Sequence, residues 1–118
     1  MKKNTGLMRI VYASQYSWQG LKSALKNEAA FQQEFVAFVL LTITTFFLDI
    51  TAVEQVAMIT SLLLVLIVET LNSAIECVVD RVSIERHTLS GRAKDYGSLA
   101  VLIALIIVIL TWSVILFN

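Results

Sequence analysis

The chain contains no proline, one cysteine and four glycines among its 118 residues. The single thiol, Cys77, has no partner for an internal disulfide bridge, and so little proline and glycine excludes a collagen-like or low-complexity chain. Charge is also scarce, because charged residues make up 15% and nine basic side chains balance nine acidic ones. Without a net positive charge there is no electrostatic basis for binding nucleic acid.

Hydrophobic side chains are abundant. They make up 58% of the chain, against about 45–50% in a typical soluble domain, and the mean hydropathy is +0.79. The length suits one domain. We therefore expect a single membrane-embedded domain over residues 1–118, with an all-α, integral-membrane fold.

Three membrane spans are predicted, at about 29–48, 53–80 and 96–117. Residues 96–117 contain no charge, and at about 1.5 Å per residue they can cross a hydrocarbon core of roughly 30 Å. The uncharged runs 35–48 and 55–68 are shorter, at 14 residues each, and soluble core helices reach such lengths too. A soluble fold would, however, have to hide three apolar helices in a very short chain.

The basic residues predict the orientation of these spans. The connection 49–54 carries two acids and no base, and no base follows residue 117. The bases before the first span or between the second and third are Lys2, Lys3, Arg9, Lys22, Lys26, Arg81, Arg86, Arg92 and Lys94. By the positive-inside rule, the N-terminus and the 81–95 connection are expected in the cytoplasm and the C-terminus outside.

Residues 7–26 have the pattern of an amphipathic helix. One stripe holds Leu7, Ile10, Val11, Trp18, Leu21 and Leu25, and the other face holds Arg9, Tyr16, Gln19, Ser23 and Lys26. Such a helix can lie on the cytoplasmic membrane surface, with Trp18 at the level of the headgroups. Packing against the cytoplasmic end of the bundle is the alternative.

The second span carries a polar stripe. Its members recur at helical spacing and are Glu69, Asn72, Ser73, Glu76 and Asp80. Counting from the start of the span places Glu69 just inside the cytoplasmic edge of the membrane, with Glu76 about 10 Å nearer the cytoplasm. A charge in the bilayer core costs about 2.5–3.5 kcal/mol even on the gentler scales, so the stripe requires an explanation.

Two interpretations of the stripe are open. Its acids can pair with the nearby bases Arg81, Arg86, Arg92 and Lys94, and Asp80 is a candidate for such a pair. Alternatively, the carboxylates can bind a hard cation such as Mg²⁺, which prefers oxygen ligands and substrate phosphates. Glu28, Lys94 and Asp95 can gather at the same depth, whereas Glu34 is expected to lie at another.

The residues by themselves leave three classes of function open: a lipid kinase, an ion- or proton-coupled membrane subunit with a carboxylate relay, and a non-enzymatic structural or assembly protein. The chain has no Walker loop and no protein-kinase motif. Any use of ATP would therefore not involve a standard soluble nucleotide fold.

Three stretches combine acidic, amide and basic side chains at fixed spacing. They are Glu69-Thr70-Leu71-Asn72-Ser73-Ala74-Ile75-Glu76 with Val78-Val79-Asp80-Arg81, Leu89-Ser90-Gly91-Arg92-Ala93-Lys94-Asp95, and Asn27-Glu28-Ala29-Ala30-Phe31. Together they resemble the signature of the prokaryotic diacylglycerol kinase family over nearly the whole chain. The N-terminal amphipathic segment is most similar to the Gram-negative branch of that family.

The resemblance implies a homotrimeric enzyme of the bacterial inner membrane, with its C-terminus in the periplasm. Such an enzyme moves the γ-phosphoryl group of MgATP to diacylglycerol and yields phosphatidic acid. An undecaprenol kinase of the same family is the alternative.

The resemblance also implies roles for residues. Glu69 would be the general base, Asn72 would orient the site, and Glu28 and Glu76 would hold Mg²⁺. ATP contacts are implied for Arg9, Tyr16, Glu28, Glu76, Glu85, Arg86, His87, Lys94 and Asp95. Lipid contacts are implied for Arg9, Trp18, Glu69 and Ser98, in a groove beside the amphipathic helix.

Overall fold

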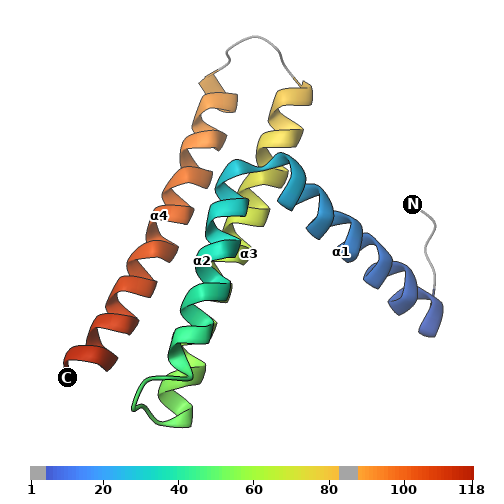
Figure 1. The fold of residues 1–118 in the computed structure, drawn as a ribbon. Coiled ribbons are helices and arrows are strands. Elements are labelled where there is room, and N and C mark those ends of the chain that lie inside the picture. Colours follow the sequence, from blue (N-terminus) through green and yellow to red (C-terminus); the bar gives the residue numbers. More distant parts are fainter. Residues whose placement is uncertain (1–4, 83–87) are drawn as a thin grey trace.

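The computed structural model describes residues 5–82 and 88–118, and every regular element in them is a helix (Figure 1). The four helices are α1 (Leu7–Asn27), α2 (Ala29–Thr45), α3 (Ala52–Val82) and α4 (Thr88–Phe117). Their main contacts follow chain order, from α1 with α2 to α3 with α4. The all-α expectation is confirmed for this part of the chain.

The turn between α2 and α3 is closed by local hydrogen bonds. The backbone N–H groups of Phe46 and Phe47 donate to carbonyls of the last turn of α2, which ends the helix. Thr51 and Glu54 then form a reciprocal capping box: Thr51 N–H donates to Glu54 Oε1 at 2.9 Å and Glu54 N–H donates to Thr51 Oγ1 at 3.1 Å. Such a box satisfies two of the otherwise unpaired donors at a helix start.

Helices α3 and α4 form the most extensive contact of the fold. Their shared core is small and includes Met58, Leu62, Val65 and Ala104, all buried. Trp112 on α4 reaches across and donates its indole N–H to the Met58 carbonyl at 3.3 Å. Because the core is small, most large apolar side chains of these helices face outward, among them Ile67, Ile109 and Phe117.

Two helices, α3 and α4, are long and apolar enough to cross a membrane by length and composition. Helix α2 is apolar but has only 17 residues, or about 25 Å of helix at 1.5 Å per residue. The outward-facing apolar side chains fit a lipid environment better than water.

The helix ends differ from the sequence prediction in two places. The first predicted span reaches residue 48, but α2 ends at Thr45 because the next three residues form the turn. The third begins at residue 96 in the prediction, whereas α4 starts at Thr88. The uncharged run marks only the apolar part of α4, and its polar first turns continue the same helix.

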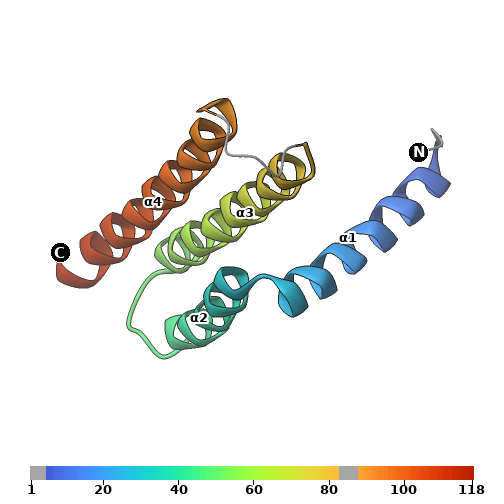
Figure 2. The ribbon, with the colours of Figure 1, turned by 90° about the horizontal axis from the view of Figure 1, so that it is seen from above.

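Helix α1 leaves the bundle at a bend. Glu28 has an extended backbone, with φ −113° and ψ 103°, and breaks the helical path between α1 and α2. From there α1 runs obliquely away from the other three helices, which lie side by side (Figures 1 and 2). None of its residues is buried. This arrangement favours the surface-helix interpretation over packing against the end of the bundle.

Candidate active site

The polar stripe of α3 has a buried half and an exposed half. Glu69 and Asn72 are only 6% and 9% exposed, whereas Glu76 and Asp80 are exposed. The stripe thus runs from the interior of the helix bundle toward the end of α3. A buried carboxylate next to exposed ones is an arrangement that can separate a proton-accepting group from groups that bind a soluble ligand.

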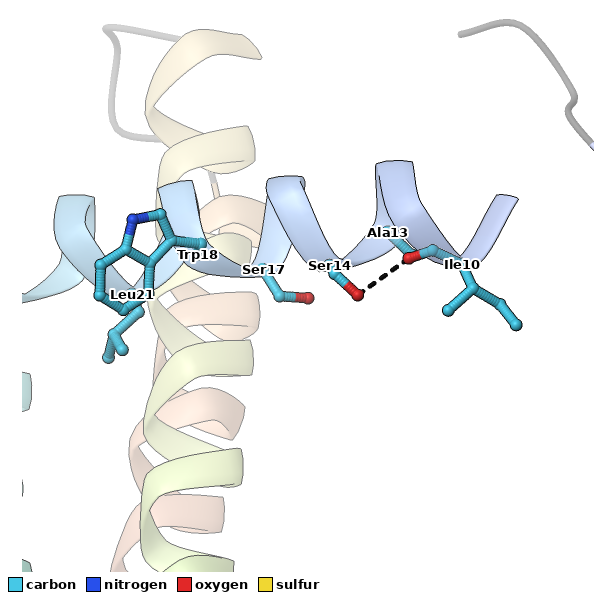
Figure 3. Close-up of a pocket in the computed structure, with 6 residues that line it drawn as sticks. All are labelled: Ile10, Ala13, Ser14, Ser17, Trp18 and Leu21. Carbon is cyan, nitrogen blue, oxygen red and sulfur yellow. Dashed lines mark hydrogen bonds between the residues drawn. The ribbon is translucent and has the colours of Figure 1, made fainter. Parts of the chain in front are cut away.

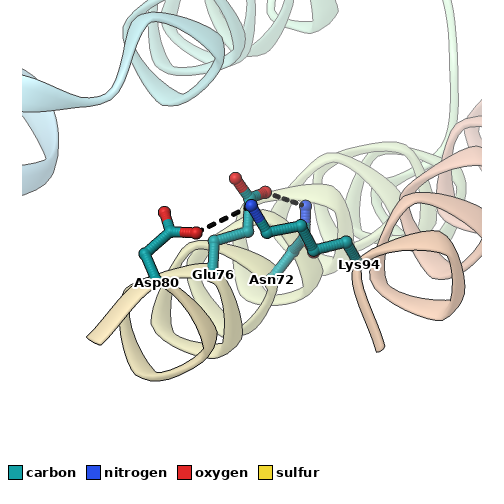
Figure 4. Close-up of polar contacts among 4 residues, drawn as sticks. All are labelled: Asn72, Glu76, Asp80 and Lys94. Atoms are coloured by element: carbon teal, nitrogen blue, oxygen red, sulfur yellow. Dashed lines mark hydrogen bonds and ion pairs between the residues drawn. The ribbon is translucent and has the colours of Figure 1, made fainter. Parts of the chain in front are cut away.

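Asn72 connects these two halves. Its Nδ2 donates to Glu76 Oε1 at 3.0 Å (Figure 4). A carboxylate only accepts hydrogen bonds, so the amide nitrogen has to face Glu76 and the amide oxygen has to face the other way. That oxygen, Oδ1, is buried and has no hydrogen-bond partner.

Asp80 pairs with a base from the neighbouring helix. Lys94 Nζ on α4 lies 2.7 Å from Asp80 Oδ1 (Figure 4). The hydrogen bond to Asp80 and the charge of that carboxylate raise the pKa of Lys94 above its usual range, and the charge of Glu76 acts in the same direction. The pairing interpretation is therefore confirmed for Asp80, and it places a protonated lysine beside the acidic stripe.

Acids from the start of α2 also face the stripe. The charges of Glu28 and Glu34 both interact with Glu69. Glu34 lies six residues further along the chain than Glu28, which agrees with the predicted difference in depth. The hydrogen bond from Gln55 to Thr45 fixes α2 antiparallel to α3, and counting back along both helices brings Glu34 level with the turn before Glu69. Its Oε2 is buried without a hydrogen-bond partner.

The other predicted site residues are on α4, on α1 or outside the described part of the chain. Asp95 and Ser98 are exposed on α4. The stretch Glu85, Arg86 and His87 lies outside the described residues, as do Lys2 and Lys3. Within residues 5–82 and 88–118, no hydrogen bond or ion pair joins the side chains of α1 to the stripe.

Helix α1 presents its own concave surface (Figure 3). The concave space has a volume of about 510 Å³. It is lined by Ile10, Ala13, Ser14, Ser17, Trp18 and Leu21. All of them come from one helix, and Trp18 is 60% exposed. The cation of Lys22 lies 5.8 Å from the centre of the Trp18 ring. Arg9 and Tyr16 project from the same exposed helix.

Within the described part of the chain, no three His, Cys, Asp or Glu side chains are close enough to hold a metal ion together. The charges of Glu28 and Glu76 both act on Glu69. Mg²⁺ typically takes one or two protein carboxylates and completes its shell with water and substrate phosphates.

Comparison with known proteins identifies the relatives of this chain. The profile of the prokaryotic diacylglycerol kinase family matches residues 15–116. This chain belongs to that family. It is 54% identical to a diacylglycerol kinase of Escherichia coli over 114 residues, covering 97% of this chain and 93% of the relative. It is 56% identical to one of Haemophilus influenzae over 118 residues, covering 99% of each.

A third relative, a diacylglycerol kinase of Pseudomonas aeruginosa, is 50% identical over 98% of this chain and 94% of its own length. Membership in a kinase family covering nearly the whole chain favours an enzyme over a carrier subunit or an assembly protein. The polar stripe of α3 is then the natural candidate for the active site.

Sequence reasoning missed one residue at the site, Gly97. Gly97 of α4 is buried and stands directly against the Asn72 carboxamide. A glycine inside an apolar helix has no chemistry of its own, and only the contact between α3 and α4 shows where it lies.

Proposed function

We propose that this chain is a diacylglycerol kinase, which transfers the γ-phosphoryl group of ATP to the lipid hydroxyl and yields phosphatidic acid. The observation that carries the proposal is the buried carboxylate of Glu69, on the same helix face as the hydrogen-bonded pair Asn72–Glu76, in a chain of this family. The names of the relatives at 50–56% identity favour diacylglycerol over undecaprenol.

We place the site at the cytoplasmic face of the bacterial inner membrane, with three spans formed by α2, α3 and α4 and with α1 on the membrane surface. The fold supports this placement. Arg81, Arg92 and Lys94 belong to the end of α3 and the start of α4, while the C-terminus lies near the acidic α2–α3 turn at the other end (Figure 1). Such separation fits the positive-inside rule.

Glu69 is proposed to act as the general base. The hydroxyl of diacylglycerol lies where the hydrocarbon meets the headgroups, and a buried carboxylate near the end of an apolar span reaches that depth. Glu69 accepts the hydroxyl proton as the lipid oxygen forms its bond to the γ-phosphorus. The bond from that phosphorus to the bridging oxygen breaks, and ADP leaves with the electron pair. Phosphoryl transfer depends mainly on such positioning and on charge stabilisation.

The exposed half of the stripe is proposed to bind the nucleotide. Lys94 is protonated beside Asp80 and can offer its remaining N–H donors to phosphate. The remaining nucleotide contacts are proposed for Arg9, Tyr16, Glu28, Glu76, Asp95 and residues 85–87. Asn72 keeps the Glu76 carboxylate oriented through its hydrogen bond.

The donor set fits Mg²⁺. Glu28 and Glu76 offer carboxylate oxygens, the ligand type that this cation prefers, and a carboxylate has two oxygens, so one can accept from Asn72 while the other remains available. Bound Mg²⁺ would neutralise the charge that develops on the ATP phosphates.

The proposed assembly is a homotrimer with sites shared between subunits. Arg9, Tyr16 and Trp18 lie on a helix that diverges from the stripe (Figure 1), as expected if they complete the site of a neighbouring subunit. In such an assembly Trp18 and Ser98 are proposed to contact lipid, and the exposed apolar faces of the bundle meet other subunits or the membrane.

The direct test is ATP-dependent phosphorylation by the purified protein in mixed micelles, with dioleoylglycerol and undecaprenol offered separately, with and without Mg²⁺. We expect Mg²⁺-dependent phosphatidic acid from dioleoylglycerol. If only undecaprenol is phosphorylated, undecaprenol replaces diacylglycerol as the proposed substrate. No product from either lipid, together with proton or ion flux across vesicles, would contradict a kinase and support a transport subunit.

A further inference from the structure

The active-site amide Asn72 is held from two sides. On its own helix, Nδ2 donates to Glu76 Oε1. On the facing helix, Gly97 lies so close that a Cβ atom there would overlap Asn72 Oδ1 and lie 2.9 Å from Asn72 Cγ. The Cβ atom of Asn72 itself leaves more room, since it would lie 3.7 Å from a Cβ added at Gly97. The tight contact therefore involves the carboxamide group alone.

The need for glycine at position 97 is one of space. The only glycine with a positive φ among the described residues is Gly6, and Gly97 sits inside α4 with an ordinary helical backbone. In such a position alanine favours the helix over glycine. Helix propensity therefore does not explain the glycine at position 97. The space taken up by the Asn72 carboxamide does explain it.

The buried oxygen of Asn72 strengthens this reading. Asn72 is only 9% exposed, and its Oδ1 has no hydrogen-bond partner. An unsatisfied buried oxygen costs free energy, so the carboxamide would turn toward a partner if the surrounding atoms allowed it. The Glu76 hydrogen bond holds the carboxamide in this orientation, and the absence of a side chain at Gly97 leaves the room that the orientation needs.

We propose that Gly97 is a positioning residue for the kinase reaction. By lacking a side chain, it leaves the space in which the Asn72 carboxamide stands, and so fixes the orientation in which Asn72 holds the Glu76 carboxylate. This inference rests on the proposed function, because it assigns Gly97 a role only through Asn72 and Glu76.

The test is Gly97→Ala, measured in mixed micelles with dioleoylglycerol and MgATP. The added methyl group displaces the flexible end of Asn72 and leaves the helix backbone in place, so the protein is expected to fold. We expect kcat to fall by about ten- to a hundredfold, the effect of misplacing a catalytic group by about 1 Å. The KM for dioleoylglycerol should stay unchanged, and half-maximal activity should require more Mg²⁺, since Glu76 loses its fixed orientation.

The matched control is Gly20→Ala, the same exchange inside a helix where no atom lies within 4 Å of the added Cβ. It should keep the wild-type kcat and Mg²⁺ dependence. An unimpaired Gly97→Ala beside an active wild type would overturn the role of Gly97 alone. An inactive wild type would instead overturn the proposed function, and with it this assignment.

A second comparison remains decisive even if Gly97→Ala fails to fold. In an Asn72→Ala background the carboxamide is gone, so Gly97→Ala no longer meets an obstacle. The double variant should be at least as stable to heat as Asn72→Ala, because alanine favours the helix over glycine, and it should match Asn72→Ala in residual activity. A double variant that is less stable or less active than Asn72→Ala would show that position 97 acts through another contact, and would overturn the proposal.

Discussion

At the scale of single residues, the stripe of α3 divides its acids between two tasks. Asp80 is engaged by Lys94 at 2.7 Å, while Glu69 is buried and interacts with other acids only through their charges. Both members of the Asp80–Lys94 pair are well exposed, and exposed ion pairs contribute little to stability. The main effect of the pair is to hold the Lys94 ammonium group beside the acidic stripe.

Separate substitutions of Lys94 and Asp80 distinguish a role in ATP binding from a role in stability. Lys94→Met should raise the KM for ATP by about tenfold, roughly the worth of one hydrogen bond between charged groups, because it removes a proposed phosphate contact. Asp80→Asn keeps the cation and should leave both the KM for ATP and the thermal midpoint unchanged. Steady-state kinetics at varied ATP decide the matter. Equal increases in KM for both variants would contradict phosphate binding by Lys94.

Since the pKa of Lys94 is raised, its charge is retained at every pH below the usual lysine range. The pair is therefore expected to persist through neutral pH and to weaken only as pH rises through that raised pKa. The KM for ATP should accordingly show no ionisation of Lys94 between neutral and moderately alkaline pH, which a pH series of ATP titrations checks. An inflection that appears in the wild type and vanishes in Lys94→Arg would contradict this.

How far the site could be predicted differs from residue to residue. The spacing of Glu69, Asn72 and Glu76 is a property of one helix, so sequence is enough to place them on one face. The approach of Glu34 to Glu69 depends on the register of α2 against α3, which the hairpin hydrogen bonds set, so the sequence alone does not give it. Gly97 could not be found at all, since its importance depends on a contact between two helices.

At the scale of elements, the α2–α3 hairpin depends on a local signal. The sequence Thr51-Ala52-Val53-Glu54 before an apolar run is the pattern of a capping box, and it could have been recognised without a structure. The end of α2 carries no comparable signal. Apolar residues continue through Leu48, and only the backbone hydrogen bonds of Phe46 and Phe47 show that the helix has stopped.

Removing the cap should destabilise the fold without affecting chemistry. Thr51→Ala is expected to cost about 0.5–2 kcal/mol, the usual effect of losing an N-cap side chain, and to leave kcat unchanged because the turn lies far from Glu69. Thr44→Ala is the control, since that hydroxyl bonds only to Leu40 O within its own helix. Denaturant unfolding in detergent measures both. Equal stability of Thr51→Ala and wild type would contradict a stabilising cap.

At the scale of the whole molecule, the arrangement of the helices leaves the chain incomplete as a folded unit in water. Three helices with a small shared core and many outward apolar side chains need lipid or further subunits to cover them. Helix α1 diverges from the bundle (Figure 2). Composition predicted the membrane environment, whereas the direction of α1 depends on the bend at Glu28.

Orientation is tested by reporters fused to the C-terminus. Three spans with a cytoplasmic N-terminus place that end in the periplasm, so an alkaline phosphatase fusion should be active and a green fluorescent protein fusion dark. The reverse pattern would contradict the orientation or the number of spans. Activity of the fused enzymes toward diacylglycerol serves as the check on folding.

The central claim is that Glu69 carries out proton transfer in the phosphorylation of diacylglycerol. The most direct measurement compares Glu69→Gln with Glu54→Gln, the same exchange on the same helix at the exposed capping turn, by phosphatidic acid formed from dioleoylglycerol and MgATP. We predict that Glu69→Gln folds and loses activity by about 10²–10⁴-fold, the usual contribution of a general base, while Glu54→Gln stays active. A folded Glu69→Gln with wild-type turnover would contradict the account.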